Sequence, residues 1–277
     1  MPSSQGFTSR RAEWSISLER SVPRSAARRL SGVDLIVGFC LASAAGFAWL
    51  WLAMGPMAGA GMDMAAMAGI ETPVWSALYL LPAFVMWVLM MVAMMLPSAA
   101  PMILLHARVL RQSRPERWRS ETALFVLAYL AVWSLFSAAA AIAQAVLVAA
   151  ELVSALTLSI GSGTAAAILL ILAAAYQLSP LKRTCLRECR SPLHFVMRYS
   201  RPGPAGALRL GFIHGLHCLG CCWALMLVLF VGGAMNLLWA AALAALVIFE
   251  KYAPSAAFSR VIAGLLAAGA VALLAAG

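Results

Sequence analysis

Residues 211–230 read GFIHGLHCLGCCWALMLVLF and combine an apolar run with two histidines and three cysteines. A helix that crosses a bilayer needs roughly 20 mostly apolar residues, and this run has that length. Polar and reactive side chains inside such a helix usually face the interior of a bundle and mark function. At helical spacing, one stripe of the helix, with Cys222 at its edge, carries His214, His217, Cys218 and Cys221. The stretch therefore predicts a membrane helix with a ligand-binding face.

The composition of the whole chain is that of an integral membrane protein. Only 11% of the 277 residues are charged and 64% are hydrophobic, whereas a soluble domain carries about 25% charged residues. Seven apolar runs follow one another, at residues 33–54, 74–96, 122–148, 164–178, 211–232, 235–249 and 261–276. We therefore expect an all-α, polytopic transmembrane bundle of about seven spans. Six is the alternative, because the fourth, sixth and seventh runs are short.

Basic residues predict the orientation of these spans. All 20 Lys and Arg lie in the N-terminal tail or in the connections that follow the second, fourth and sixth runs. The other connections hold only the acidic residues Asp63, Glu71 and Glu151. Because Lys and Arg accumulate on the cytoplasmic side, we expect a cytoplasmic N-terminus. The net charge of +10 is then a topology signal that also attracts anionic lipid, and no nucleic acid partner is needed to explain it.

We divide the chain into a basic cytoplasmic tail (residues 1–32) and one transmembrane domain (residues 33–277). The domain includes a Met-rich outer loop (54–73) and a Cys-containing cytoplasmic segment (180–209). Ser179-Pro180 and Ser191-Pro192 are each an N-cap residue followed by proline, which predicts two short helices. Cys185 and Cys189 share one face of the first and could complete the site of the fifth span. Disulfides are rare in the reducing cytoplasm, so metal binding or redox cycling is expected of these cysteines.

Methionines are concentrated in two places. The outer loop offers Met57, Met62, Met64 and Met67 among glycines and alanines, with no core for them to fill. The second span carries Met86, Met90 and Met94 on one face, flanked by Met91 and Met95. Packing explains that stripe better than metal binding does. Thioethers together with thiolates select Cu(I), and thiolates alone also bind zinc, the alternative metal.

One ion cannot use every ligand of the fifth span, because His214 and Cys222 are separated by roughly 12 Å along a helix axis. The tightest subset is Cys218 and Cys221 with either His217 or Cys222. The remaining polar positions suggest ordinary roles. Cys40 is expected to be a small buried side chain and the pair Glu250–Lys251 to be solvated at the inner surface. His106 and His194 are expected at the surface, and interhelical hydrogen bonds are expected for Gln144, Gln177 and Asn236.

Three motifs resemble a bacterial family described as predicted metal-binding integral membrane proteins. They are MWVLMMVAMMLPS (86–98), YQLSPLKRTCLRECRSP (176–192) and HCLGCCWALM (217–226). The similarity runs from about residue 81 to 251 and includes LFVGGAMNLLW (229–239) and the closing pair EK (250–251). A member of the family is linked to copper supply for a tyrosinase-type polyphenol oxidase. The resemblance implies a copper-handling protein whose matching motif positions are Cys185, Cys189, Cys218, Cys221 and Cys222.

We therefore expect a multi-pass protein of the bacterial inner membrane that binds Cu(I) and passes it to a cuproenzyme or a copper chaperone, without catalysis. The first alternative is a membrane thiol oxidoreductase that uses Cys218 and Cys221. The second is a haem protein with His214 or His217 as axial ligand, and a third is a structural assembly partner. The direction of metal transport and the oligomeric state stay open.

Overall fold

The computed structural model describes residues 32–54, 73–155, 157–253, 255 and 257–276. These residues form helices and, apart from one isolated bridge between Val153 and Ile160, no β-structure. The helices are α2 (Gly32–Met54), α4 (Ala77–Ser113), α5 (Trp118–Ala149), α6 (Gly163–Gln177), α7 (Pro180–Arg190), α8 (Pro192–Tyr199), α9 (Pro204–Leu227), α10 (Leu229–Gly232), α11 (Leu237–Tyr252) and α12 (Ala257–Ala276). The expected all-α class is confirmed. The basic tail and the Met-rich loop with Met57, Met62, Met64 and Met67 lie outside the described residues.

Five stretches are long and apolar enough to cross a membrane: α2, α4, α5, α9 with α10, and α12. Helices α6 and α7 pass the same test together but are bent by 62° where they meet. Counting that pair as one span gives six. Helix α11, which we expected as a further span, has only 16 residues. Helix α4 has 37 residues and continues well beyond the predicted end at residue 96.

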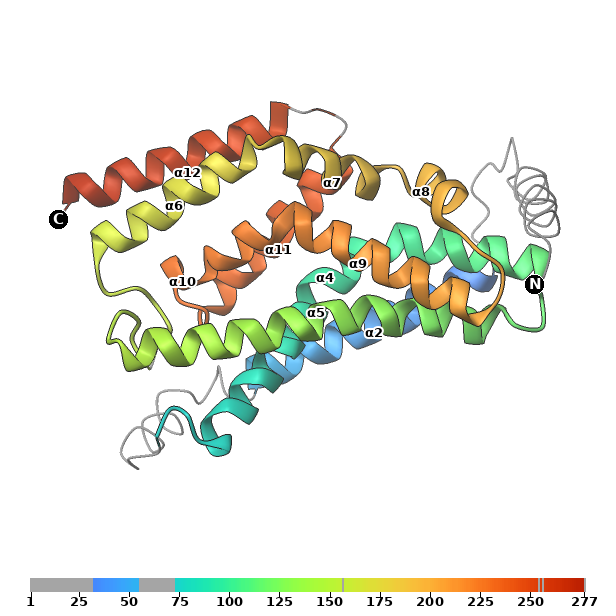
Figure 1. Cartoon of the computed structure of the whole chain (residues 1–277), viewed down its shortest axis with the longest axis horizontal. Coiled ribbons are helices and arrows are strands. Elements are labelled where there is room, and N and C mark those ends of the chain that lie inside the picture. The colour runs from blue at the N-terminus through green and yellow to red at the C-terminus, as the bar shows by residue number, and fades with distance from the viewer. Residues whose placement is uncertain (1–31, 55–72, 156, 254, 256, 277) are drawn as a thin grey trace, which may run out of the picture.

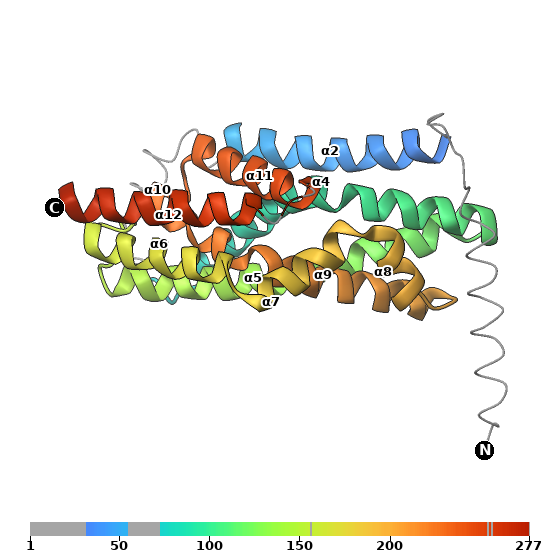
Figure 2. The same ribbon diagram turned by 90° about the horizontal axis from the view of Figure 1, so that it is seen from above.

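The helices lie side by side along the long axis of the molecule (Figures 1 and 2). Helix α5 packs between α4 and α9, while α2 covers α4 at one edge and α12 pairs with α6. Glycines allow the closest of these contacts. A Cβ on Gly211 would lie 2.1 Å from the carbonyl oxygen of Phe125, and one on Gly215 would lie 2.9 Å from Val132. Because small residues let backbones approach, α5 and α9 form the tightest pair around the site.

Two short helices, α7 and α8, connect α6 to α9, as the two Ser-Pro pairs predicted. The Ser179 hydroxyl accepts a hydrogen bond from the backbone N–H of Lys182 (3.1 Å) and caps α7, while Ser191 starts α8 without a side-chain bond. Helix α7 then packs against α9. This contact brings the cysteines of two helices together.

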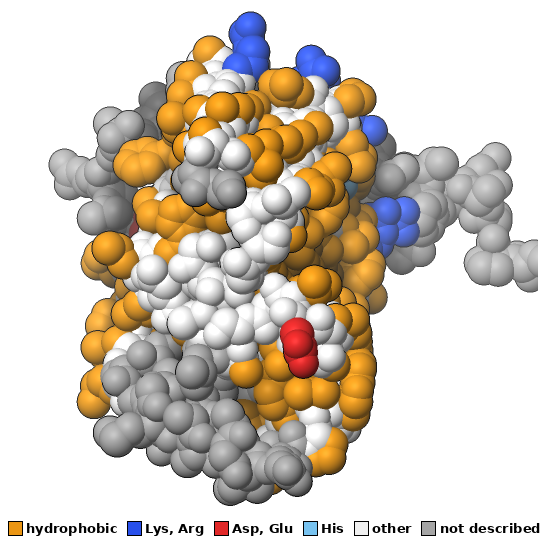
Figure 3. Space-filling view, turned by 90° about the vertical axis from the view of Figure 1, so that its left-hand side faces the viewer, with side chains coloured by type: hydrophobic (Ala, Val, Ile, Leu, Met, Phe, Trp, Pro, Cys, Tyr) orange, Lys and Arg blue, Asp and Glu red, His pale blue; other side chains and the backbone are white. Residues whose placement is uncertain are grey.

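The basic residues gather at one end of the helices. Residues 108–119, from the end of α4 to the start of α5, and residues 182–209, from α7 to the start of α9, carry 12 of the 14 described Lys and Arg residues, whereas residues 150–162 between α5 and α6 contain Glu151 as their one charged residue. Figure 3 looks at this second end: apolar side chains and backbone dominate, and Lys and Arg appear only at its edge. The two ends of the bundle therefore differ in charge.

Candidate metal site

Helix α9 places three thiols inside the protein. Cys218, Cys221 and Cys222 are each 0–1% exposed. The thiols of Cys221 and Cys222 donate hydrogen bonds of 3.1 and 3.0 Å to the backbone carbonyl of Cys218. A buried thiol finds this acceptor one turn back along its own helix, so the three sulfur atoms are directed to the same side.

A second helix adds to this group. The Cys189 thiol of α7 lies close enough to that of Cys221 for the two to interact electrostatically. Cys185 lies one turn earlier, and its Sγ would be only 2.7 Å from a Cβ on Gly220. Glycine at position 220 therefore makes room for Cys185. We call Cys189, Cys218, Cys221 and Cys222 the thiol cluster.

The methionines of α4 approach the cluster at one point. Met86, Met90 and Met94 are 0–3% exposed and pack in the core, as expected of a packing stripe. It is the flanking Met95 that reaches the site, with its Sδ 3.8 Å from Cys222 Sγ. A thioether thus completes the set of sulfur atoms.

Lys251 lies against the cluster, contrary to our expectation of a solvated pair. Its ammonium group donates hydrogen bonds to Cys218 Sγ (3.0 Å) and to Ser98 Oγ (2.8 Å). The Tyr129 hydroxyl lies 3.1 Å from the same sulfur and donates to the Met95 carbonyl (3.0 Å). The prediction of surface exposure was wrong because the end of α11 packs against α4, α7 and α9, which leaves Lys251 8% exposed.

Glu250 is buried as well, with 2% exposure. Its carboxylate pairs with Lys182 (2.7 Å) and accepts a hydrogen bond from Ser259 (2.6 Å). Lys182 is itself 1% exposed. Moving such ions out of water costs several kcal/mol each, so they stay buried only when paired. Lys182 and Glu250 thus neutralise each other, whereas Lys251 has no carboxylate partner among the described residues.

The two histidines of α9 lie beside the cluster and make no hydrogen bond to its sulfur atoms. His217 Nδ1 is 2.8 Å from the Ile213 carbonyl, which ties the ring to its own helix. His214 is 4% exposed and packs against Phe125 and Tyr129, and its Nδ1 has no hydrogen-bond partner among the described residues. Of the two, His214 is the one with a buried ring nitrogen that has no partner among the described residues.

The predictions for the remaining polar residues can now be compared with the structure. His106 is 3% exposed and stacks near Phe125, because α4 continues as a buried helix where a surface segment was expected. Cys40 is exposed, because it lies on the side of α2 that faces away from α4. The Asn236 side chain caps its own helix by accepting from Trp239 N. Gln144 does bond across helices, to Trp87 and Tyr79. His194 is exposed beside Glu188, as expected.

Two cavities lie beside the cluster. One of about 240 Å³ is lined by Ser98, Cys189, His214 and Lys251. A second, of about 940 Å³, shares Lys251 and Arg190 with it. Cys189 of the cluster therefore borders the smaller cavity, and Lys251 borders both cavities.

The donor set suits a soft ion, since it consists of thiols and a thioether. Among the described residues, no group of three or more His, Cys, Asp or Glu side chains is arranged to hold a metal ion. The thiols of Cys221 and Cys222 instead bond to the backbone and would have to rotate to bind one.

These features define a helical protein with several helices apolar enough to cross a membrane and with a buried soft-donor cluster. A family described as PpoB2, copper chaperone, matches residues 84–273, more than half of the chain, and the protein belongs to this family. The match confirms the resemblance to a family linked to copper supply for a polyphenol oxidase. It gives no support to the oxidoreductase or haem alternatives. We found no match among curated proteins and none among solved structures.

Proposed function

We propose that this protein is an integral protein of the bacterial inner membrane that holds Cu(I) at the thiol cluster and passes it to a cuproenzyme or chaperone. The observation that carries the proposal is the convergence of four thiols from α7 and α9 with Met95 and Lys251. Copper is the cargo, and ligand exchange between sulfur sites suffices for its transfer. No bond-making catalysis is needed.

Charge supports a singly charged cargo. Lys182 and Glu250 cancel, and Lys251 leaves one positive charge beside Cys218. Cu(I) held by two thiolates carries a net charge of −1, which this ammonium group offsets at short range. Zinc in closed protein sites takes four tetrahedral ligands, and a thioether ligand favours Cu(I) over zinc.

Methionines offer a route from the opposite end. We propose that Met57, Met62, Met64 and Met67 collect copper outside the cell membrane and that the stripe of Met86, Met90 and Met94 leads inward to Met95. Cys185, beside Gly220, would be the next thiol after the cluster. Copper uptake at limiting copper, measured after changing the four outer methionines to leucine, tests the first part of this route.

The proposed function is tested by the metal content of the purified protein. We expect about one Cu(I) per chain after reconstitution under reducing conditions, retained against a chelator that removes weakly bound copper. Elemental analysis measures copper and zinc together. A protein that binds zinc in preference to copper, or that takes up no metal, would contradict the proposal.

The orientation is tested separately. We expect a reporter fused at Arg114, between α4 and α5, to be cytoplasmic and one at Gly61 to be extracytoplasmic, because the basic connections stay inside. Alkaline phosphatase and green fluorescent protein fusions report opposite compartments. The same compartment for both positions would contradict a cytoplasmic N-terminus.

A further inference from the structure

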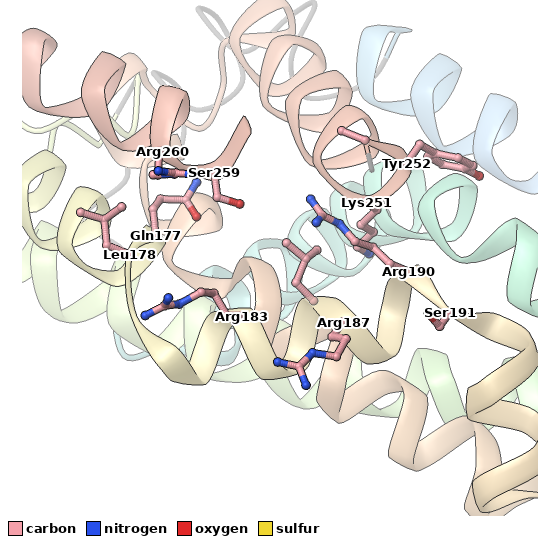
Figure 4. A pocket seen from close by; sticks show the side chains of 12 residues that line it. Gln177, Leu178, Arg183, Arg187, Arg190, Ser191, Lys251, Tyr252, Ser259 and Arg260 are labelled. Atoms are coloured by element: carbon pink, nitrogen blue, oxygen red, sulfur yellow. The ribbon is translucent and has the colours of Figure 1, made fainter. Parts of the chain in front are cut away.

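The larger cavity lies where four helices meet and its lining is strongly basic. It is bounded by the end of α6, by α7, by the end of α11 and by the start of α12. Figure 4 shows Gln177, Ser259 and Arg260 on one side, Arg183 and Arg187 on the second, and Arg190 with Lys251 on the third. Among the residues that the structure describes, no Asp or Glu lines it. Its volume of about 940 Å³ is at the upper end of the range for ligand pockets.

Two of the arginines are available to a ligand. Arg190 is bound to the Glu250 carbonyl (2.7 and 3.1 Å), and Lys251 is turned to Cys218. Arg187 and Arg260 are exposed and make no hydrogen bond or ion pair with the described residues. Guanidinium groups bind phosphate and carboxylate with two parallel hydrogen bonds, so a cavity that presents two of them is suited to an anion.

Gln177 gives independent evidence of a ligand. It is 2% exposed, and both its amide nitrogen and its amide oxygen lack a partner among the described residues. Our expectation of an interhelical bond for this residue was wrong. An unsatisfied buried polar group costs about 1–3 kcal/mol, and Gln177 lines this cavity. A ligand that both accepts and donates hydrogen bonds would remove that cost.

The rim of the cavity is apolar. Leu178 and Tyr252 line it and are 50% and 56% exposed, and the nearby Phe249 and Val261 are exposed too. Helix α6 ends and α12 begins at the cavity, while α4, α5 and α9 continue past it towards the basic end (Figure 1). The cavity thus lies where α6 ends and α12 begins, with exposed apolar side chains beside it.

We propose that this cavity binds the phosphate group of an anionic phospholipid between Arg187 and Arg260, with Gln177 bonded to the headgroup and the acyl chains along the exposed apolar rim. Basic pockets between helices on the cytoplasmic side of membrane proteins bind lipid headgroups by the same physics. Free phosphate has the same chemistry, but it would leave the rim uncovered and most of the cavity unfilled.

The test compares lipid binding by the full-length protein and two variants. Native mass spectrometry of the detergent-purified protein measures the binding of phosphatidylglycerol and of phosphatidylcholine with identical acyl chains. We expect the wild type to prefer phosphatidylglycerol and Arg187→Gln with Arg260→Gln to bind it about 10- to 100-fold more weakly, because two charge-assisted contacts are lost. The control, Arg117→Gln with Arg201→Gln, removes two exposed charges elsewhere and should bind like the wild type.

Inorganic phosphate and glycerol 3-phosphate are the competing probes. Failure of both to displace the lipid at millimolar concentration supports a headgroup held together with its acyl chains. If either probe displaces the lipid in a way that depends on Arg187 and Arg260, the cavity recognises phosphate but is assigned to a soluble phosphate in place of a lipid. Equal lipid binding by the two double variants, or no preference for phosphatidylglycerol, would overturn the proposal. Both variants should keep their Cu(I), so the result is independent of the proposed copper function.

Discussion

The double variant Cys218→Ser with Cys221→Ser is expected to bind Cu(I) at least about 100-fold more weakly than the wild type. Replacing ligands should lower the affinity more than replacing the residues that support them, which costs about 10- to 100-fold. Serine is close to cysteine in size, but its hydroxyl is a hard, protonated group that cannot replace a thiolate for a soft ion. Folding should survive, since a serine hydroxyl can also bond to the carbonyl one turn back. Competition with a Cu(I)-specific chelator measures the affinity.

Cys40→Ser is the matched control for this experiment. It makes the same chemical change at an exposed cysteine of α2, outside the cluster, and should leave the affinity unchanged. Cys222→Ser and His217→Ala should each lower the Cu(I) affinity less than the double change does. Met95 still lies beside position 222 and offers a sulfur ligand, and the His217 ring is bonded to its own helix. Wild-type Cu(I) affinity in the double variant, together with loss of function in cells, would instead identify Cys218 and Cys221 as a redox pair.

Lys251→Met is expected to lower Cu(I) affinity about 10- to 100-fold, the effect of losing a partner that supports a metal ligand. The change keeps a long unbranched side chain and removes the charge that faces Cys218. The anionic copper–thiolate group would then be left in the core without an opposite charge, where Coulomb energies are large. Chelator competition measures the loss, and circular dichroism establishes that the helices persist.

Lys251→Arg is the charge-preserving counterpart. It should recover a substantial part of the affinity, although the larger guanidinium group must fit beside Ser98 and Cys218. If methionine and arginine at position 251 gave the same affinity as lysine, the ammonium group would have no electrostatic role at the cluster. If Lys251 had a purely structural role, the methionine and arginine variants would lose the same amount of Cu(I) affinity as each other and the same amount of thermal stability.

Local patterns in the sequence predicted the parts of the structure that depend on neighbours along the chain. The apolar runs predicted the helices, Ser179-Pro180 predicted the start of α7, and helical spacing predicted one stripe with Cys218 and Cys221 and with Cys222 at its edge. Each of these follows from helix geometry alone.

The contacts between helices were not predictable in the same way. Lys251 follows an apolar run, which is typical of a charge at the membrane interface, yet its side chain is buried against α4 and α9. His106, which was expected at the surface, is buried, and Cys40, which was expected to be buried, is exposed. Burial depends on which side of α4 and α2 has a neighbour. Met95, at the flank of the predicted stripe, is the methionine that reaches the cluster. The closing Glu250–Lys251 motif was visible in the sequence and could have drawn attention to this position.

The two thiol bonds to the Cys218 carbonyl bear on how fast copper can leave. Binding of Cu(I) at the proposed site would require Cys221 and Cys222 to give up these bonds, at about 1 kcal/mol each. A loss of about 2 kcal/mol corresponds to roughly a 30-fold weaker hold on the ion. These bonds form again when the metal leaves, so they stabilise the metal-free form relative to the copper-bound form. Such a site favours short residence times, a property that suits a donor more than a store.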